Sequence, residues 1–210
     1  MTFLSQQEVR DIVEKHGIPI VKEKVVKTKQ EALQFAGKIG YPVVLKLVSS
    51  QVSHKTEVGG VVVNIRNKQQ LEDEYTKMEE RMREQKIKAD GYLVQEYVHG
   101  YEMIVGGKQD PQFGPVVLFG AGGIFTEVLQ DKTIRVCPVE KKDALEMIEE
   151  VKFSKVFKGF RGEPPVDKER VADIILKVSK IMGTGIKELD INPLIVSSKI
   201  CKAVDFRIVK

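Results

Sequence analysis

Oxygen-bearing side chains gather in the segment ELDINPL at residues 188–194. Asp190 and Asn192 are two residues apart, so on a strand both point to the same face, and a strand carrying Asp205 can pair alongside. Mg²⁺ prefers oxygen ligands, takes few of them from protein, and completes its shell with water and substrate phosphates. These residues indicate a magnesium-nucleotide site, although Asp190 and Asn192 fit a turn before Pro193 equally well.

A lysine interrupts an otherwise apolar segment at residues 42–48. Lys46 would be costly to bury without a partner, and a phosphate group would satisfy its charge. The alternative is a residue at the edge of a sheet, with a buried stem and a charged end in water.

A polar loop at residues 53–61 ends in Gly59 and Gly60. Paired glycines let the backbone approach a ligand closely, as in loops that cover phosphates, but they also fit the hinge of a hairpin. Further on, Glu96 and Glu102 flank a short connection between two expected strands. There a carboxylate can accept hydrogen bonds from ribose hydroxyls, unless both side chains simply face solvent.

The elements that must position these residues follow from capping residues and apolar periodicity. Capping boxes at Ser5 and Thr28 each begin a helix, and these helices end near Gly17 and Gly40. Further helices are expected at 67–85, 142–151 and 167–182. Strands are expected at 42–48, 59–65, 92–98, 102–106, 115–119, 133–139, 186–191, 194–196 and 201–206, the third and fourth as a neighbouring pair.

Composition excludes several classes of protein. The net charge is only +4 and the lysines are not gathered into a tract, so nucleic acid is not an expected partner. No apolar run approaches the roughly 18 to 20 residues that span a bilayer, so we expect a cytoplasmic protein without a membrane partner. Cys137 and Cys201 are far apart, which predicts reduced thiols rather than a disulfide or a zinc site.

Six segments together resemble one protein family. They occur in order as VVLK at 43–46, HKTEVGGV at 54–61, VQEY at 94–97, FGPVV at 113–117, GGIFTE at 122–127 and ELDINPL at 188–194. Over nearly the whole chain they resemble the ATP-grasp β subunit of ADP-forming (NDP-forming) acyl-CoA synthetases of the acetate-CoA ligase type. They resemble succinyl-CoA synthetase β subunits more distantly.

The resemblance implies a mixed α+β ATP-grasp fold over residues 1–210, with two lobes that hold the nucleotide between them. The lid-like lobe would span about 20–95 and the magnesium- and nucleotide-binding lobe 96–210. By the same resemblance, the phosphates of ATP or ADP would meet Lys46 and the loop with Gly59 and Gly60. The remaining implied contacts are adenine at Gln95, Glu96 and Val98, ribose at Glu102, and Mg²⁺ at Asn192 and Asp205, with Asp190 in or beside that shell.

The family interconverts acyl-CoA, ADP and phosphate with free acid, CoA and ATP through phosphohistidine. His54 and Lys55 match the family's histidine-lysine loop, so His54 would be a transient phosphoacceptor, with Lys55, Lys46 and Mg²⁺ neutralising charge on the phosphoryl group. Arg135 could add to this charge. His16 and His99 receive no role and are expected at the surface.

The sequence has no Gly-x-Gly-x-x-Gly fingerprint and no second large domain for CoA. The resemblance therefore implies a CoA-binding α subunit, in an α2β2 heterotetramer, without which the chain would be inactive as a ligase. Two alternatives remain open: another ATP-grasp carboxylate ligase that works through an acyl phosphate, and a non-catalytic nucleotide-sensing module. A phosphorylated His54 would separate the first function from both.

Overall fold

The computed structural model describes residues 4–52, 55–123, 131–160 and 162–210. The chain divides into two compact units. The main unit combines residues 1–20 with residues 99–210, and the inserted unit comprises residues 21–98. The mixed helix-and-strand class expected from the sequence is confirmed.

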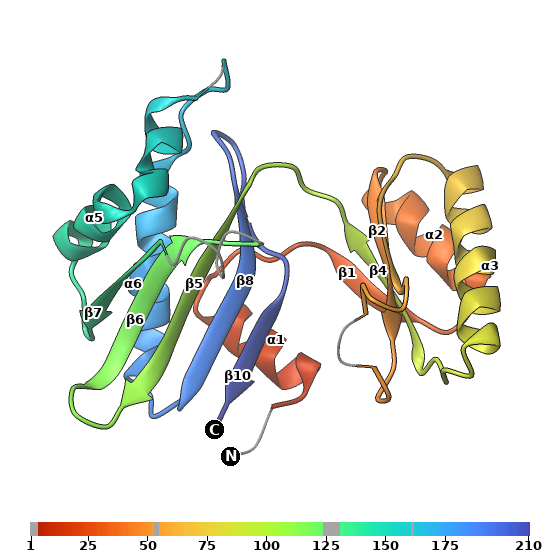
Figure 1. Ribbon diagram of the computed structural model, residues 1–210, viewed down its shortest axis with the longest axis horizontal. Coiled ribbons are helices and arrows are strands. Elements are labelled where there is room, and N and C mark those ends of the chain that lie inside the picture. Colours follow the sequence, from red (N-terminus) through yellow and green to blue (C-terminus); the bar gives the residue numbers. More distant parts are fainter. Residues whose placement is uncertain (1–3, 53–54, 124–130, 161) are drawn as a thin grey trace. The chain divides into compact units, whose positions relative to one another are not determined.

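The inserted unit is a four-stranded antiparallel sheet covered on one face by two helices (Figure 1). The strand order is β1-β4-β2-β3. Side chains at Thr28 and Asn67 cap the two helices by accepting a backbone N–H three residues on. The elements are β1 (Glu23–Val26), α2 (Lys29–Ile39), β2 (Val43–Val48), β3 (Val61–Ile65), α3 (Lys68–Glu84) and β4 (Gly91–Glu96).

Alternation along β2 decides which side chains meet the helices. Val43, Leu45 and Leu47 are buried in one cluster with Tyr75 of α3. Because successive strand residues point to opposite faces, Lys46 lies on the face away from α2 and α3.

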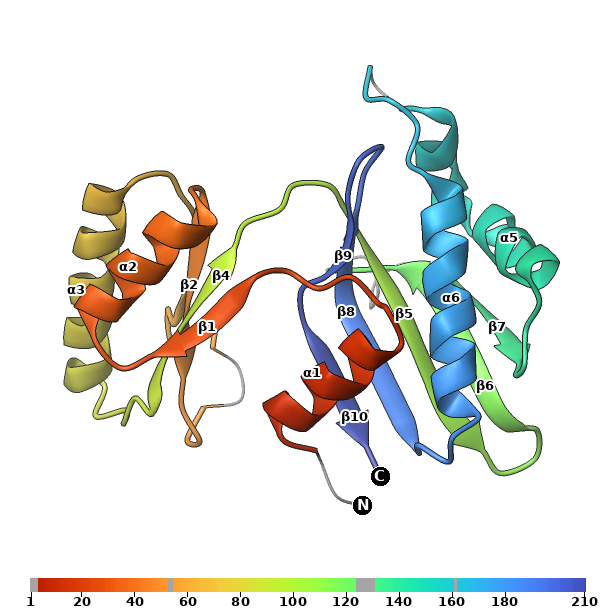
Figure 2. The same cartoon turned by 180° about the vertical axis from the view of Figure 1, so that it is seen from behind.

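The main unit is a six-stranded sheet in the order β10-β8-β5-β6-β7, with β9 paired to β8. Figure 2 shows α1, α5 and α6 on one face of this sheet. The opposite face carries the candidate site. The elements are α1 (Gln6–Lys15), β5 (Tyr101–Asp110), β6 (Gly114–Ala121), β7 (Lys132–Val136), α5 (Lys141–Glu150), η1 (Lys152–Lys158), α6 (Lys168–Met182), β8 (Glu188–Val196), β9 (Cys201–Ala203) and β10 (Phe206–Val209).

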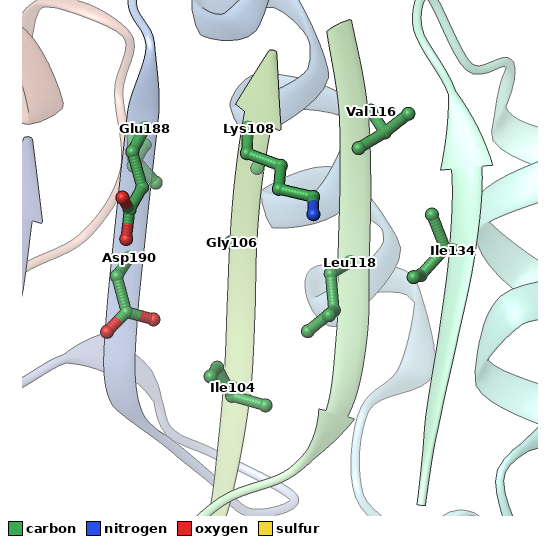
Figure 3. Close-up of a pocket in the computed structure, with 10 residues that line it drawn as sticks. Ile104, Gly106, Lys108, Val116, Leu118, Ile134, Glu188 and Asp190 are labelled. Carbon is green, nitrogen blue, oxygen red and sulfur yellow. The ribbon is translucent and has the colours of Figure 1, made fainter. Parts of the chain in front are cut away.

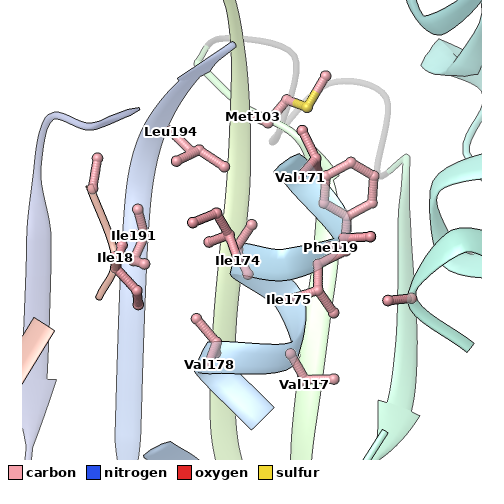
Figure 4. Close-up of a cluster of buried hydrophobic side chains, with 14 of the residues drawn as sticks. Ile18, Met103, Val117, Phe119, Val171, Ile174, Ile175, Val178, Ile191 and Leu194 are labelled. Atoms are coloured by element: carbon pink, nitrogen blue, oxygen red, sulfur yellow. The ribbon is translucent and has the colours of Figure 1, made fainter. Parts of the chain in front are cut away.

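Helix α6 is the principal partner of this sheet. Val171, Ile174, Ile175 and Val178 belong to the same buried cluster as Phe119 of β6 (Figure 4). Fully burying such aliphatic side chains stabilises the fold by roughly 1.5–3 kcal/mol each. The site face of the sheet therefore rests on a well-packed core.

The structure corrects three expectations and adds two elements. The strands expected as a neighbouring pair at 92–98 and 102–106 lie in different sheets, since β4 pairs with β1 and β2, and β5 pairs with β6 and β8. The strands expected at 186–191 and 194–196 form the single strand β8, which continues through Pro193. The strand expected at 201–206 is divided between β9 and β10, and β1 and η1 were not predicted.

The helices of the described chain are too short or too polar for any of them to span a membrane.

Candidate functional site

The structure brings the three predicted metal ligands into one pocket of the main unit. Asp190 and Asn192 lie on the same face of β8, because Ile191 between them is buried against the helices. Asp205 directly precedes β10, and its carbonyl oxygen accepts the Asn192 backbone N–H at 3.0 Å. A pocket of about 260 Å³ is lined by Asp190, Asn192, Asp205, Phe206 and Arg207.

Electrostatics in this pocket suit a cation. Burial raises the pKa of the Asp190 carboxyl, the Arg207 guanidinium opposes that rise, and the negative charges of Glu188 and Asp205 add to it. The Arg207 Nη2 atom is 3.8 Å from Asp190 Oδ2. Among the described residues no three His, Cys, Asp or Glu side chains cluster as a metal site. The pocket lining instead offers the side-chain oxygens of two carboxylates and one amide, which are the kind of ligand that Mg²⁺ takes.

A groove of about 320 Å³ begins at Asp190 and crosses the same face of the sheet (Figure 3). Its apolar lining includes Ile104, Leu118 and Ile134. At Gly106 an added Cβ would lie 3.0 Å from the Leu189 carbonyl oxygen and 3.6 Å from Asp190 Oδ1. The glycine thus keeps the groove open beside the carboxylate. Asp190 lines both the groove and the metal-ligand pocket.

Sequence reasoning missed this groove. The side chains that line the groove alternate along each strand with side chains buried in the core. For example, Ile104 lines the groove, whereas its neighbours Met103 and Val105 are buried. Alternation within β5 was visible in the sequence, whereas the order of β8, β5, β6 and β7 was not. The groove exists because that order places these strands side by side.

Glu102, the predicted ribose ligand, is exposed on the groove side of β5. Its carbonyl oxygen accepts the Gly122 N–H at 2.9 Å, and a Cβ added at Gly123 would overlap its carboxylate. Gly122 and Gly123, the first two residues of the glycine-rich segment GGIFTE at 122–127, therefore leave room for Glu102. The rest of that motif, residues 124–127, lies outside the described residues.

In the inserted unit, Lys46 and Gln95 share the face of the sheet away from the helices. Lys46 pairs in register with Leu93, which is two residues from Gln95 on β4. Lys46 is half-buried, whereas Gln95 is only 1% exposed and its Nε2 donates to Glu23 Oε2 at 2.6 Å. The two predicted nucleotide ligands therefore project from the same surface of one sheet.

Glu96 is held at the end of β4 by Lys22. Its Oε2 accepts the Lys22 N–H at 3.0 Å, and its own N–H donates to the Lys22 carbonyl at 2.7 Å. Val98, two residues on, is half-buried and is the last residue of the inserted unit. The predicted adenine segment thus follows directly from a strand end with fixed geometry.

The loop with Lys55 closes as a single helical turn. The Gly60 N–H donates to the Lys55 carbonyl at 2.7 Å and the Gly59 N–H donates to the Thr56 carbonyl at 3.1 Å. Gly59 has φ of 65°, so these bonds form a Schellman motif, in which glycine is the favoured residue. Gly59 and Gly60 therefore have structural reasons to be glycine, whether or not they meet a phosphate. His54 lies outside the described residues.

Two further residues have structural roles that the sequence did not predict. Arg135 donates to the Glu150 carboxylate of α5. Because Ile134 lines the groove, Arg135 faces the opposite side of the sheet, and we assign it no part in the site. Asp131, which follows the glycine-rich segment, is 7% exposed and its carboxylate accepts two backbone N–H groups at the start of η1.

A family model described as an ATP-grasp domain matches residues 1–209. The chain belongs to the ATP-grasp family. The acetate–CoA ligase (ADP-forming) I subunit beta of Pyrococcus furiosus is 44% identical, over 98% of this chain and 91% of that protein. The 4-hydroxybutyrate–CoA ligase (ADP-forming) of Nitrosopumilus maritimus is 39% identical, over 98% of this chain but 30% of that longer protein.

Solved structures agree with this family assignment. The dinucleotide-forming acetyl-coenzyme A synthetase 1 of Ca. Korarchaeum cryptofilum, in complex with coenzyme A and Ca-AMPCP, is 41% identical. It matches with a TM-score of 0.89 over 99% of this chain and 93% of that one. A second structure of that enzyme, with Mg-AMPPCP and its phosphohistidine segment pointing towards the nucleotide binding site, has a TM-score of 0.85 and 40% identity over 99% and 92% of the two chains.

These comparisons confirm the predicted ATP-grasp fold and the resemblance to β subunits of ADP-forming acyl-CoA ligases. The Pyrococcus relative is named as one subunit of an enzyme, which implies a partner subunit. The individual roles predicted for Lys46, the Lys55 loop, Glu96 and the metal pocket remain predictions, as does the division into a lid-like lobe and a magnesium-binding lobe.

Proposed function

We propose that this chain is the nucleotide-binding β subunit of an ADP-forming acyl-CoA ligase. The observation that carries the proposal is the pocket shared by Asp190, Asn192 and Asp205, which opens on a grooved sheet face in a chain 44% identical to such a subunit. The proposed reaction uses ADP, phosphate and acyl-CoA and yields ATP, free acid and CoA. We place it in the cytoplasm because these are soluble metabolites.

Asn192 and Asp205, with Asp190 in or beside the shell, would hold Mg²⁺. The donor chemistry fits, since the oxygens come from one pocket and the half-buried Asp190 already experiences neighbouring negative charge. Bound there, Mg²⁺ would neutralise phosphate oxygens and orient them for transfer. The exposed Asp205 and half-buried Asn192 leave the pocket open to a nucleotide.

In this proposal the phosphates of ADP or ATP meet Lys46 and the turn with Gly59 and Gly60. Adenine meets the strand end with Gln95 and Glu96 and the backbone near Val98, and ribose meets Glu102. The Lys22 N–H supports the Glu96 assignment because its hydrogen bond fixes Glu96 Oε2. With that oxygen fixed, the direction of the other carboxylate oxygen is fixed as well.

His54 is the proposed transient phosphoacceptor, with Lys55 as its charge-neutralising neighbour. The phosphorus–nitrogen bond of phosphohistidine breaks as a bond forms from phosphorus to a terminal oxygen of ADP, which leaves neutral imidazole and ATP. The Korarchaeum structure with a phosphohistidine segment directed at its nucleotide site supports a relay of this kind. The proposed relay has two histidines: a CoA-binding α subunit, in an α2β2 assembly, would supply the principal phosphohistidine segment, and its phosphoryl group would pass to His54 and then to ADP.

Binding of Mg-ADP by calorimetry tests the metal pocket. Asn192→Ala and Asp205→Asn are expected to weaken Mg-ADP binding about tenfold or more, with a much smaller effect on ADP measured in EDTA. Asp173→Asn is the matched control, because Asp173 is an exposed carboxylate on α6, on the helix-covered face. Unchanged Mg-ADP affinity in both pocket variants would exclude this pocket as the metal site.

Acid-labile phosphate tests the relay. The chain is incubated with labelled ATP and Mg²⁺, with and without its CoA-binding partner, and phosphohistidine is measured. His54→Ala is expected to abolish label on this chain and acyl-CoA-dependent ATP synthesis. If both survive, the relay assignment is wrong, and if the wild-type complex makes acyl phosphate without phosphohistidine, an acyl-phosphate ligase is the correct function.

A further inference from the structure

The turn that carries Lys55 is fixed at its far end to the core of the inserted unit. Its last carbonyl, at Gly60, accepts the Leu47 N–H of β2 at 2.7 Å. Since the Gly60 N–H also binds the Lys55 carbonyl, one residue connects the backbone of Lys55 to the sheet. The position of Lys55 therefore depends on how firmly Gly59 and Gly60 are held.

Arg81 of α3 holds the other side of this turn. Its Nη1 donates to the Gly59 carbonyl at 2.6 Å, and the bond is partly buried. Gln85, one helical turn further on, donates from Nε2 to the Val58 carbonyl at the longer distance of 3.4 Å. A Cβ added at Gly59 would lie 2.7 Å from Arg81 Nη1, so the guanidinium lies directly against the turn.

Helix α3 is itself a rigid base for this contact. Tyr75, Met78 and Met82 of α3 are buried in the core of the inserted unit at no more than 2% exposure. Arg81 projects from the same helix, next to Met82, so its guanidinium is placed by the packed core. A charged donor to a partly buried carbonyl makes a stronger hydrogen bond than a neutral donor does.

We propose that Arg81 is a positioning residue for phosphoryl transfer, which holds the Lys55 turn where Lys55 neutralises the transferring group. This inference rests on the proposed function of the chain. Arg81 acts through Gly59 and does not itself contact nucleotide. Phosphoryl transfer is sensitive to such placement, because a displacement of about 1 Å at a reacting group can cost about a hundredfold in rate.

The consequence is a separation of kcat from KM. Arg81→Met keeps much of the apolar stem but removes the donor to the Gly59 carbonyl. It is expected to lower kcat for ATP formation by roughly ten- to a hundredfold, while KM for ADP stays within about twofold. A role confined to stability would instead lower the melting temperature and leave the kcat of the folded fraction unchanged.

The experiment uses the complex of the full chain with its CoA-binding partner, and measures ATP formation from acetyl-CoA, ADP and phosphate. Arg83→Met is the matched control, since Arg83 is exposed two residues along the same helix. Hydrogen exchange at the Gly59 and Gly60 amides is measured on the same variants. Exchange is expected to rise about tenfold or more in Arg81→Met and to stay at the wild-type rate in Arg83→Met.

A wild-type kcat in Arg81→Met overturns the proposal, whatever the exchange rates show. Equal losses of kcat in Arg81→Met and Arg83→Met also overturn it, because the effect would then be charge on the helix rather than the bond to Gly59. If Arg81→Met does not fold, Arg81→Leu, which also lacks a donor to the Gly59 carbonyl, replaces it. A lower kcat with unchanged KM and melting temperature then supports the role, and an unchanged kcat refutes it.

A wild-type complex that forms no ATP from acetyl-CoA or from other acyl-CoA substrates contradicts the proposed function of the chain. The exchange measurement then still reports whether Arg81 fixes the turn. Failure of the proposed function and failure of the positioning role are thus distinguished by different measurements.

Discussion

Replacing Asp131 with alanine should destabilise the main unit by an amount that follows from two hydrogen bonds. Asp131 Oδ1 accepts the Lys152 N–H and Oδ2 accepts the Phe153 N–H, both at 2.8 Å. The side chain is buried, so water cannot readily replace the carboxylate. These two amides lie at the start of η1, where backbone N–H groups have no partner within the helix.

A hydrogen bond to a charged group contributes about 1.5–3 kcal/mol, and partial relaxation around the new cavity reduces the combined loss. We therefore expect Asp131→Ala to cost about 3 kcal/mol. The main unit has about 130 residues, for which such a loss corresponds to a fall of about 10 °C in Tm. Asp131→Asn keeps one acceptor oxygen and should lose about half as much.

Differential scanning calorimetry on the purified chain measures this change, with Asp110→Ala as the control. Asp110 also accepts two backbone N–H groups, from Gln112 at 3.0 Å and Phe113 at 3.1 Å, but in an exposed turn. The Tm of Asp110→Ala should differ from that of the wild type by no more than about 3 °C, because water replaces the carboxylate in the exposed turn. Equal shifts in Asp131→Ala and Asp110→Ala would refute burial as the source of the effect.

Two further predictions concern the core. Burial raises the pKa of the Cys201 thiol to about 12, so the folded chain keeps a proton that the unfolded chain loses near pH 9. The free energy of unfolding, measured by urea titration, should therefore fall between pH 9 and 11. The fall should be smaller in Cys201→Ala, which has no thiol to titrate. Gly107→Ala places a Cβ 2.5 Å from Met182 Cγ and 2.8 Å from the Val116 carbonyl oxygen. It should lower the free energy of unfolding, measured in urea, by about 2 kcal/mol. Gly37→Ala is the control: Gly37 lies on α2 with open space around it, so this change should not destabilise the chain.

The sequence predicted the elements whose ends and periodicity are both strong. Helix α6 has an aspartate cap at Asp167 and an unbroken apolar stripe, so its limits were clear. Strand β1 has only four residues, two of them charged, and so gave too short an alternation to recognise. The η1 helix forms because Asp131, distant in the sequence, binds its first N–H groups, and no local pattern indicates that.

The pairing error between 92–98 and 102–106 has a different cause. Two extended segments joined by a short connection containing Gly100 have the pattern of a hairpin, whichever sheets they join. Here Glu96 ends β4, a strand of one sheet, and Tyr101 begins β5, a strand of the other sheet. Propensity and loop length do not determine strand partners, because partners are chosen by the core that each strand helps to bury.

For the candidate site, local spacing in the sequence predicted the pocket residues, whereas the groove could be predicted only from the order of the strands. The period of two predicted that Asp190 and Asn192 share a face, and the return of the chain brought Asp205 beside them. The groove over Gly106 needed the order of the central strands. The anchoring of the Lys55 turn by Arg81 joins residues 22 positions apart through tertiary structure, beyond the reach of a local pattern.

The division of the chain into a contiguous inserted unit and a main unit with two separate segments has a consequence for folding order. All strand partners in the inserted unit come from residues 21–98, so it can form its sheet early during synthesis. Helix α1 cannot find its place then, because Val9 and Val13 pack in the main-unit core and the Leu4 N–H binds the Ile208 carbonyl of β10. The closure of so long a loop makes this late docking step slow relative to local folding. Until β10 is made, the apolar face of α1 stays exposed, and this interval is when the nascent chain is most open to aggregation.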